Sequence, residues 1–424
     1  MSEPSWRERI KKIPAVIMAA GKSSRFWPLN FSGNKCLTSV MGQPILAYTI
    51  RSLVTAGIKE IILVINQSEK DTFRGYFGEG QSLKVKIKYA LQKKPLGQAN
   101  AILSAKDYLK SAPEFLVFNA EQVNAGEFLP TVINFKIKEK ADLVLIGKET
   151  SQPWKYGILE LKEKRVVALV EKPAQGEEPS KLRVVGIYFL NNDFLEYLGK
   201  QPVAEYQLET SLNGFMKQKQ VLVLETNKET ISAKYPWDLL KVKDYLLERI
   251  QHQLSPYASV AQTAIIKPPV IIKTGALIGE FATVEGPAYI GESAVVGAYS
   301  TLRACSSLEL GAQVQRDVDV KNSLILPGAH LHSGFIGDSI IGEDCRVGAD
   351  FLTANRRLDR QEIFSAVDGK KIATGLTSFG TVVGPKTRIG IRVSTMPGKL
   401  IGANCLIGPG KIVRENIDDK EEVW

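Results

Sequence analysis

The chain has 424 residues, of which 44% are hydrophobic and 24% are charged, and it carries a formal net charge of +10. A chain of this length exceeds one ordinary hydrophobic core, so we expect two or more globular domains, and no apolar run is long enough to span a membrane. The basic residues are scattered and do not form blocks with aromatic residues between them, which argues against a nucleic-acid-binding protein.

The first clear elements are a buried strand and the polar turn that follows it. Residues 13–20 form an apolar run, and Gly21, Lys22 and Arg25 come directly after it, with Lys35 in the next polar segment. A tight turn at the carboxyl end of a parallel strand presents backbone N–H groups, to which these side chains add positive charge. This combination suits the binding of a polyphosphate. The alternative is an ordinary strand–helix turn with surface lysines and no binding role.

Strands and helices alternate through the first half of the chain. We expect helices at 5–12, 43–56, 69–77, 95–109 and 127–138, and strands at 60–66, 84–91, 114–120 and 141–147. Such alternation is typical of a mostly parallel sheet covered by helices on both faces. Three strands of a β-region beside the main sheet and one closing helix are then predicted at 156–161, 165–171, 183–190 and 235–251.

From Ile272 the sequence changes to a repeat of six residues. One aliphatic residue recurs at every sixth position, in the series Ile272, Ile278, Val284, Ile290, Val296, Leu302, Leu308, Val314, Val320 and Leu326. This period is the signature of a β-helix, in which three units make one triangular coil and each coil packs on the next. We expect the register to slip after Leu326, and a loop insertion over residues 351–379 separates a second series from Val383 to Val413.

The run from residue 15 to 30, with Lys35 and Leu37 after it, resembles the signature of sugar-1-phosphate nucleotidyltransferases. Those enzymes join a nucleoside triphosphate to a sugar-1-phosphate and release pyrophosphate. The resemblance implies that Arg25 and Lys35 are catalytic. It also implies a set of nucleotide-binding residues: Ala20, Gly21, Lys22, Ser23, Gln92 and Gly97. Ser23 stands where the family has a second glycine, and Asn34 stands where it has a proline.

Later positions of the resemblance concern the sugar and the metal. Gly157, Glu171 and Lys172 match family residues that bind the sugar phosphate. Relatives hold Mg²⁺ with two aspartates, and here Glu121 stands at the first position and Ser232 at the second. Glu121 is therefore the one predicted metal ligand. Two further family positions are changed, at Gln98 and Val184.

Nearly the whole chain, from about Ile13 to Val413, resembles the bifunctional UDP-N-acetylglucosamine pyrophosphorylase/glucosamine-1-phosphate N-acetyltransferase family. The resemblance implies that His332 is the catalytic base of acetyl transfer from acetyl-CoA, a role that suits imidazole near neutral pH. It further implies that the sugar phosphate is held by Arg303, Lys321 and Asn355. The alternative for His332 is a histidine at an inward or corner position of a coil. Three family positions are altered, at Phe335, Arg346 and Gln361.

Together these features predict an α/β Rossmann-like nucleotidyltransferase domain over residues 1–252, followed by a left-handed parallel β-helix of hexapeptide repeats over residues 253–424. We expect a cytoplasmic homotrimeric enzyme that functions in sugar-nucleotide synthesis, without a nucleic-acid or membrane partner. Its expected substrates are a nucleoside triphosphate, a sugar-1-phosphate and acetyl-CoA, and its expected metal is Mg²⁺. The altered metal positions leave two alternatives open. One is a catalytically degenerate regulatory subunit that binds sugar nucleotides beside a catalytic paralogue, and the other is an acetyltransferase-only protein.

Overall fold

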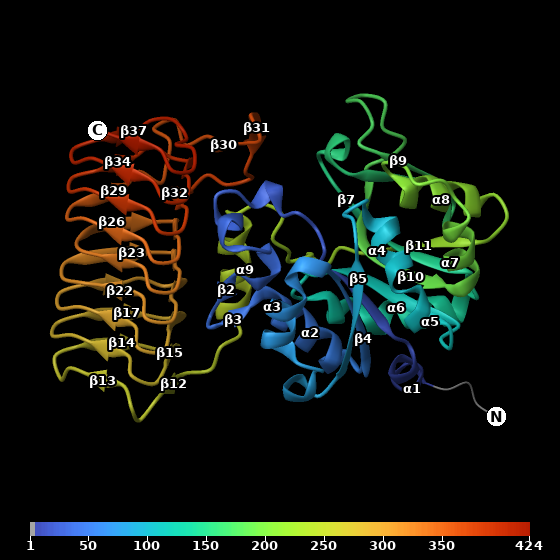
Figure 1. Cartoon of the computed structure of the whole chain (residues 1–424), viewed down its shortest axis with the longest axis horizontal. Helices are drawn as coiled ribbons and strands as arrows, with labels where there is room; N and C mark the ends of the chain where they lie inside the picture. The colour runs from blue at the N-terminus through green and yellow to red at the C-terminus, as the bar shows by residue number, and fades with distance from the viewer. Residues whose placement is uncertain (1–4) are drawn as a thin grey trace. The chain divides into compact units, whose positions relative to one another are not determined.

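The computed structural model describes residues 5–424, apart from the side chain of Ser32. The chain divides into two compact units (Figure 1). One unit holds the residues up to Lys22 together with Leu46–Thr230, and the other holds Ser23–Ile45 and Ile231–Trp424. A segment from the beginning of the chain therefore belongs to the unit that the second half builds. The predicted division between residues 252 and 253 stays a prediction.

The first unit is built on a nine-stranded sheet with the order β5-β4-β1-β6-β10-β7-β11-β9-β8. Its strands are β1 (Ala15–Met18), β4 (Glu60–Asn66), β5 (Lys86–Gln92), β6 (Glu114–Asn119), β7 (Leu143–Glu149), β8 (Gly157–Lys162), β9 (Arg165–Glu171), β10 (Leu182–Asn191) and β11 (Val221–Glu225). The strands β5, β4, β1 and β6 are parallel, and β7 is parallel to β11. This arrangement confirms the Rossmann-like α/β prediction.

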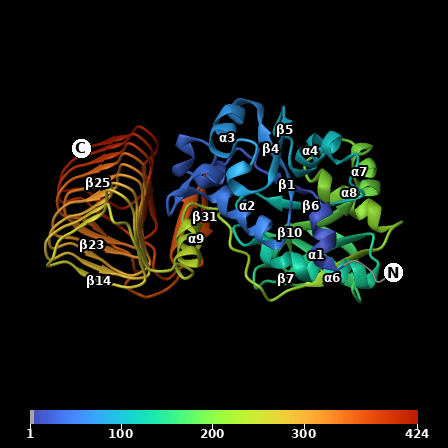
Figure 2. The same ribbon diagram turned by 90° about the horizontal axis from the view of Figure 1, so that it is seen from below.

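Helices cover both faces of this sheet (Figure 2). They are α1 (Trp6–Arg9), α2 (Ile45–Ala56), α3 (Lys70–Phe77), α4 (Gln98–Ser104), α5 (Lys106–Leu109), α6 (Leu129–Glu139), α7 (Asn192–Gly199) and α8 (Gln207–Met216). Successive strand residues such as Val16 and Ile17 point to opposite faces, and both are fully buried. Burial on both faces explains why these strands are continuous apolar runs without alternation.

The position predicted for segment 183–190 is wrong. It was expected in a β-region beside the main sheet, but β10 lies within the sheet and pairs antiparallel with both β6 and β7. Its register with β7 shifts between Val184 and Tyr188, where Gly186 has a φ of +75°. A Cβ at Gly186 would lie 2.6 Å from Nδ2 of Asn119, so glycine allows both the conformation and the close approach. The other two strands of the region, β8 and β9, do pair with each other at the sheet's end.

The second unit contains a three-sided parallel β-helix, whose coils stack from yellow to red in Figure 1. The first face holds β12 (Gln253–Leu254), β15 (Val270–Ile272), β18 (Ala288–Ile290), β21 (Ser306–Leu308), β24 (Leu324–Ile325), β27 (Ile340–Ile341), β32 (Thr381–Val383) and β35 (Lys399–Ile401). The second face holds β13 (Ser259–Val260), β16 (Leu277–Ile278), β19 (Val295–Val296), β22 (Gln313–Val314), β25 (His330–Leu331), β28 (Arg346–Val347), β33 (Arg388–Ile389), β36 (Leu406–Ile407) and β38 (Glu422–Val423). The third face holds β14 (Ile265–Lys267), β17 (Thr283–Glu285), β20 (Thr301–Leu302), β23 (Val318–Lys321), β26 (Gly334–Gly337), β29 (Phe351–Thr353), β34 (Ser394–Thr395) and β37 (Ile412–Val413). The predicted left-handed β-helix is confirmed.

The inward aliphatic residues form one continuous core along the β-helix, as the six-residue period predicts. The slip in register, however, comes one unit earlier than expected. Paired residues Ile290 and Leu308 lie 18 positions apart, but Leu308 pairs with Ile325, 17 positions on, and not with Leu326. The shortened corner contains Asn322, whose φ of +46° tightens the turn.

Several smaller elements complete the second unit. They are the hairpin of β2 (Ser39–Val40) and β3 (Gln43–Pro44), the helix α9 (Asp238–Leu247), and the hairpin of β30 (Phe364–Val367) and β31 (Lys370–Ala373). The second hairpin lies in the loop insertion. In the part of the chain that the structure describes, every helix is too short or too polar to span a bilayer.

Candidate functional site

The predicted phosphate-binding run is divided between the two compact units. The first unit holds residues 20–22, whereas Ser23, Arg25 and Lys35 belong to the second. Arg25 is exposed within the short turn η2 (Ser24–Phe26). The sequence signature is continuous, and nothing in it indicates that the boundary between the two compact units falls between Lys22 and Ser23.

Ser23 has a conformation that explains both the family's glycine and its replacement. Its φ is +56°, in the left-handed region that glycine adopts most easily. The Ser23 hydroxyl oxygen accepts a hydrogen bond from the backbone N–H of Lys35 at 3.2 Å. Nζ of Lys35 in turn donates to the carbonyl oxygen of Ala233 at 3.2 Å. The Ser23 side chain therefore joins the beginning of the loop to Lys35 through a hydrogen bond that glycine could not make.

The structure brings Gln92 and Gly97, two of the predicted nucleotide-binding residues, together in the first unit. Nε2 of Gln92, at the end of β5, donates to the carbonyl oxygen of Gly97 at 3.2 Å and to Oδ1 of Asn100 at 2.8 Å. Gly97 precedes α4 with a φ of +94°, and a Cβ there would meet no neighbouring atom. Glycine is therefore favoured at this position by its conformation and leaves the surface beside it open.

The predicted sugar-side residues also gather in the first unit. Gly157 in β8 pairs with Glu171 in β9, and a Cβ at Gly157 would lie 2.7 Å from Oε2 of Glu171. The Glu171 side chain thus lies over the space that glycine leaves. Nζ of Lys172 lies 3.8 Å from Oε1 of Glu171 and 5.7 Å from the centre of the Tyr206 ring. A carboxylate and an ammonium group side by side can bind a sugar's hydroxyl groups and its phosphate.

Glu209 and Tyr188 also lie near Glu171, and neither is among the predicted site residues. Burial raises the pKa of Glu209, and the negative charge of Glu171 adds to the effect. Burial likewise raises the pKa of the Tyr188 hydroxyl, with Glu209 and Glu171 as further causes. Glu209 belongs to α8, for which the sequence analysis made no prediction, so only tertiary structure reveals its place beside Glu171.

The residues at the family's metal positions do not form a two-carboxylate site. Glu121 follows β6, and Ser232 offers only a hydroxyl group. Asp238 is the first residue of α9, and its Oδ2 accepts hydrogen bonds from the backbone N–H groups of Lys234 at 2.8 Å and Tyr235 at 2.7 Å. Among residues 5–424, no three His, Cys, Asp or Glu side chains are grouped to hold a metal ion.

On the third face of the β-helix, Asp338 links two predicted sugar-phosphate residues. Its Oδ2 accepts hydrogen bonds from Nζ of Lys321 at 2.9 Å and from Nδ2 of Asn355. Its Oδ1 accepts from Nδ2 of Asn322 at 2.8 Å, and the residue is only 3% exposed. Asp338 therefore fixes the orientation of both side chains, a role that the sequence motif around it did not reveal.

Arg303 lies on the same face but has a different carboxylate partner. Its Nε donates to Oδ1 of Asp319 at 2.8 Å, and its guanidinium carbon lies 6.0 Å from the centre of the Phe335 ring. Arg303 directly follows β20 and Lys321 is the last residue of β23, both strands of the third face. His332 comes before β26, the next strand of that face. The predicted base and the two cations thus lie at opposite ends of strands on one face.

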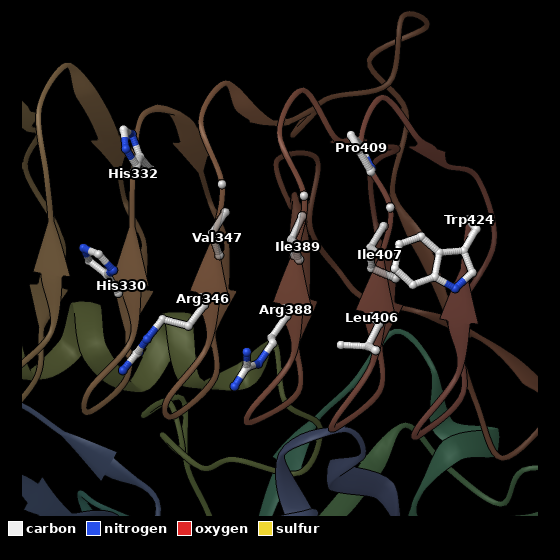
Figure 3. Close-up of a pocket in the computed structure, with 13 residues that line it drawn as sticks. His330, His332, Arg346, Val347, Arg388, Ile389, Leu406, Ile407, Pro409 and Trp424 are labelled. Atoms are coloured by element: carbon white, nitrogen blue, oxygen red, sulfur yellow. The ribbon is translucent and has the colours of Figure 1, made fainter.

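His332 lines a pocket of about 390 Å³ on the second face. The lining residues are His330, His332, Arg346, Val347, Gly348, Arg388, Ile389, Gly390, Leu406, Ile407, Gly408, Pro409 and Trp424 (Figure 3). Within this pocket, Nε2 of His330 is buried without a hydrogen-bond partner. Burial lowers the pKa of His330, and the positive charge of Arg346 lowers it further.

Two arginines occupy neighbouring strands of this pocket, as Figure 3 shows. Arg346 pairs with His330 on one side and with Arg388 on the other. Nη1 of Arg346 donates to the carbonyl oxygen of Gly328 at 2.7 Å, which fixes its guanidinium group. Strands in a sheet lie about 4.8 Å apart, so the two positive charges create a local field that favours an anionic ligand.

The sequence profile of the nucleotidyl transferase family matches residues 14–235. The bifunctional protein GlmU of Methanococcus maripaludis (strain C7) is 33% identical over 415 residues, which cover 97% of each chain. The chain belongs to the GlmU family of bifunctional nucleotidyl transferases. A second family relative, the bifunctional sugar-1-phosphate nucleotidylyltransferase/acetyltransferase of Sulfurisphaera tokodaii, is 33% identical over 95% of this chain and 98% of its own.

Membership in the family agrees with the two kinds of fold in the chain. A putative glucose-1-phosphate thymidylyltransferase of Bacillus anthracis is similar in structure, with a TM-score of 0.50 and 21% identity. That likeness covers 57% of this chain and 98% of the other, and it concerns the fold alone. This family member thus joins a nucleotidyltransferase domain to a hexapeptide-repeat β-helix of the acetyltransferase kind.

Proposed function

We propose that the protein forms a sugar nucleotide from a nucleoside triphosphate and a sugar-1-phosphate, and that it also transfers an acetyl group from acetyl-CoA. The product would be UDP-N-acetylglucosamine or a related sugar nucleotide, made in the cytoplasm. The observation that carries the proposal is the similarity to bifunctional relatives over 97% of both chains, since it includes both parts of the molecule. The side-chain clusters around Glu171 and Asp338 supply a chemical rationale for each reaction.

In nucleotidyl transfer, the sugar phosphate attacks the α-phosphorus in line and pyrophosphate leaves. Such a reaction depends mainly on positioning and on neutralising phosphate charge. We assign triphosphate binding to the backbone at Ala20 and Gly21 and to the cations Lys22, Arg25 and Lys35. Ser23 holds Lys35, Gln92 and Gly97 contact the base, and the sugar-1-phosphate binds at Gly157, Glu171 and Lys172.

Magnesium fits this donor set only in part. In proteins Mg²⁺ is often held by one or two carboxylates together with substrate phosphates. Glu121 would be its protein ligand, and the phosphates and water would supply the remaining oxygens. When bound, the ion would neutralise phosphate charge as it transfers. With a serine at position 232, we expect slow nucleotidyl transfer.

In acetyl transfer, His332 would take a proton from the amine of glucosamine-1-phosphate as the nitrogen attacks the thioester carbonyl. The carbon–sulfur bond then breaks and coenzyme A leaves as the thiol. Arg303 and Lys321 would bind the sugar phosphate, and Asn355 would contact the sugar. We propose a homotrimer assembled through the β-helix.

Two assays of the full chain test the proposal. Pyrophosphate release is measured with Mg²⁺, UTP and N-acetylglucosamine-1-phosphate, and thiol release with acetyl-CoA and glucosamine-1-phosphate. We expect slow pyrophosphate release and readily measured thiol release. We also expect that His332→Ala abolishes thiol release because it removes the base, whereas the neighbouring His330→Gln retains it. Unchanged thiol release in His332→Ala would exclude the assigned role.

A second candidate is a regulatory subunit that binds a sugar nucleotide without turning it over. The replacement of a metal-binding aspartate by Ser232 favours this alternative. It predicts tight binding of UDP-N-acetylglucosamine in calorimetry, no pyrophosphate release at any Mg²⁺ concentration, and a changed activity of a catalytic paralogue on mixing. An acetyltransferase-only protein would instead release thiol but bind neither UTP nor the sugar nucleotide.

A further inference from the structure

A buried carboxylate of the β-helix holds the loop that contains Arg25 and Lys35. Glu309 follows β21 on the first face, and it is fully buried. Its Oε1 accepts hydrogen bonds from the backbone N–H of Met41 and the hydroxyl of Ser307, each at 2.7 Å. Its Oε2 accepts from the backbone N–H of Gly42 and the hydroxyl of Ser39, each at 2.7 Å. Three of these four donors come from the β2–β3 hairpin.

The backbone of the hairpin turn is shaped to bind this carboxylate. Val40 pairs with Gln43, so Met41 and Gly42 form a two-residue turn, and both have positive φ values, of +51° and +72°. This conformation turns two successive N–H groups toward one point, which makes a binding site for an anion. The turn of the hairpin therefore forms an anion site, and Glu309 occupies it.

A tyrosine of the β-helix lies against the turn of the hairpin. A Cβ at Gly42 would lie 2.4 Å from the hydroxyl oxygen of Tyr289, a residue of β18 that is 5% exposed. Only glycine admits this approach together with the positive φ. A buried charge without partners would be very costly, so the four donors around the fully buried Glu309 carboxylate indicate a specific attachment of the hairpin.

The same loop is attached to the second unit at two further places. Nε1 of Trp27 donates to Oδ1 of Asp419 at 3.1 Å, and the same oxygen accepts from the backbone N–H of Ala403 at 2.7 Å. Lys35 donates to the Ala233 carbonyl just before α9. Arg25 lies two positions before Trp27, and Lys35 lies four positions before Ser39. Both predicted catalytic cations are thus close in the chain to an attachment point.

The helix α9 is docked on the β-helix by a second buried charge. Lys243 is fully buried, and its Nζ donates to Oδ1 of Asn322 at 2.8 Å and to the carbonyl oxygen of Cys305. The helix α9 is therefore also held by coils of the β-helix. Ala233, which accepts a hydrogen bond from Lys35, lies shortly before this helix in the chain.

We propose that Glu309 is a positioning residue for nucleotidyl transfer, which holds the loop Ser23–Ile45 in the conformation that presents Arg25 and Lys35 to the nucleotide. The inference rests on the proposed function of these two cations. It gives the β-helix a task in the first reaction in addition to acetyl transfer and assembly. The loop is thus supported by residues that lie about 270 positions later in the chain.

The variant Glu309→Gln tests this role in the full chain. It keeps the size of the side chain but replaces one acceptor oxygen with an amide that faces an N–H or hydroxyl donor. We expect the backbone amides of Met41 and Gly42 to exchange hydrogen about tenfold faster, and the Kd and KM for UTP to rise about tenfold, the effect of losing one charge-assisted contact. The KM for sugar-1-phosphate and the rate of thiol release should stay at the wild-type level.

Two further variants separate positioning from folding. Ser39→Ala removes one donor without disturbing the carboxylate, so it should give a smaller effect in the same direction even if Glu309→Gln folds poorly. Glu280→Gln is the matched control, because Glu280 is an exposed β-helix carboxylate bonded to Thr263. It should change neither loop exchange nor UTP affinity.

The outcomes distinguish this inference from the proposed function. Unchanged amide exchange in both Glu309→Gln and Ser39→Ala would overturn the docking, and faster exchange with unchanged UTP affinity would overturn the positioning role. A wild-type chain that binds no UTP would instead contradict the proposed nucleotidyl transfer. Even then, faster exchange at residues 41 and 42 would support the docking of the loop by Glu309.

Discussion

At the scale of single residues, two departures from the family pattern, at Ser23 and Asn34, have structural explanations. Ser23 replaces a glycine and keeps its left-handed conformation, but it gains a hydrogen bond from Lys35. Asn34 replaces a proline, and its Oδ1 accepts from the backbone N–H of Cys36 at 3.1 Å, which caps the turn η4 (Lys35–Leu37). Both polar side chains stabilise the loop locally. The sequence identified these positions as unusual but could not reveal the compensating bonds.

Two substitutions at Ser23 separate its hydrogen bond from its backbone strain. Ser23→Ala loses the bond and keeps the left-handed strain, so the free energy of unfolding should fall by about 1 kcal/mol. Ser23→Gly loses the same bond but relieves a strain of about 1 kcal/mol, so its stability should stay near that of the wild type. Urea unfolding of both variants measures the difference. An equal loss in the two variants would contradict the strain argument.

The pKa of His330 gives a prediction for the pH dependence of stability. Burial and the charge of Arg346 lower this pKa in the folded chain, so the unfolded chain takes up the proton first as the pH falls. Stability is therefore fully present above the ordinary histidine value near 6.5 and is lost as the pH falls from there toward the lower folded value.

The variant His330→Gln checks this sign, because it removes the titrating group. The wild type should lose more free energy of unfolding than the variant between pH about 7.5 and about 5.5, on either side of the ordinary value. An equal loss in the two proteins would show that His330 titrates alike in the folded and unfolded chains.

At the scale of secondary-structure elements, the sequence pattern predicted the strands of the β-helix well. It predicted the register of the coils and the neighbours of β10 less well. The six-residue series predicted its strands because one inward residue per unit is a constraint on every coil. The earlier slip at Ile325 was missed because Leu324, Ile325 and Leu326 are all aliphatic and leave the inward residue ambiguous. The antiparallel β10 was misplaced since an apolar run reveals burial on both faces but not the neighbouring strands.

Asp338, at the corner after β26, joins elements that the sequence could not relate. It receives hydrogen bonds from Lys321 and Asn355, which come from different coils. Asp338→Asn keeps the shape and tolerates the φ of +47° at this position, but it removes the charge. We expect the KM for glucosamine-1-phosphate to rise about tenfold and the KM for acetyl-CoA to stay unchanged, since one charge-assisted contact orients the sugar-phosphate residues.

The matched control is Asp344→Asn, at an exposed corner with a similar φ of +55°. It should leave both KM values unchanged. If the two variants affect thiol release equally, the effect of Asp338→Asn comes from the β-helix corner and not from Lys321 and Asn355.

At the scale of the whole molecule, the sequence predicted both folds but not the composition of the compact units. The nucleotidyltransferase signature assigned residues 20–35 to the predicted nucleotidyltransferase domain, residues 1–252. The structure assigns Ser23–Ile45 to the β-helix unit, through contacts such as that of Ser39 with Glu309. No local pattern encodes such a contact, because it depends on two segments 270 positions apart. The Glu309 carboxylate alone, read in the sequence, is an ordinary charged residue at a corner of a coil.

At the scale of the whole molecule we also expect the changed metal positions to limit the rate of the proposed nucleotidyl transfer. Glu121 is one methylene longer than the family's aspartate, and Ser232 lacks a carboxylate altogether. Because Mg²⁺ demands near-ideal geometry and prefers carboxylate oxygens, the double variant Glu121→Asp with Ser232→Asp should bind it more tightly in the presence of nucleotide. Asp238 already has a local role, because its Oδ2 accepts hydrogen bonds from two backbone N–H groups at the start of α9.

We expect the double variant to release pyrophosphate at least about tenfold faster than the wild type and to need less Mg²⁺ for half-maximal rate, since one added carboxylate contact is worth more than a kilocalorie. The matched control is Glu121→Asp with Ser232→Asn, which has the same size but lacks the second charge and should show little gain. An equal gain in the control would mean that side-chain size, and not the carboxylate, limits the reaction. No gain in either variant, with sugar-nucleotide binding intact, would favour the regulatory subunit, because the loss of activity would then extend beyond the metal-binding residues.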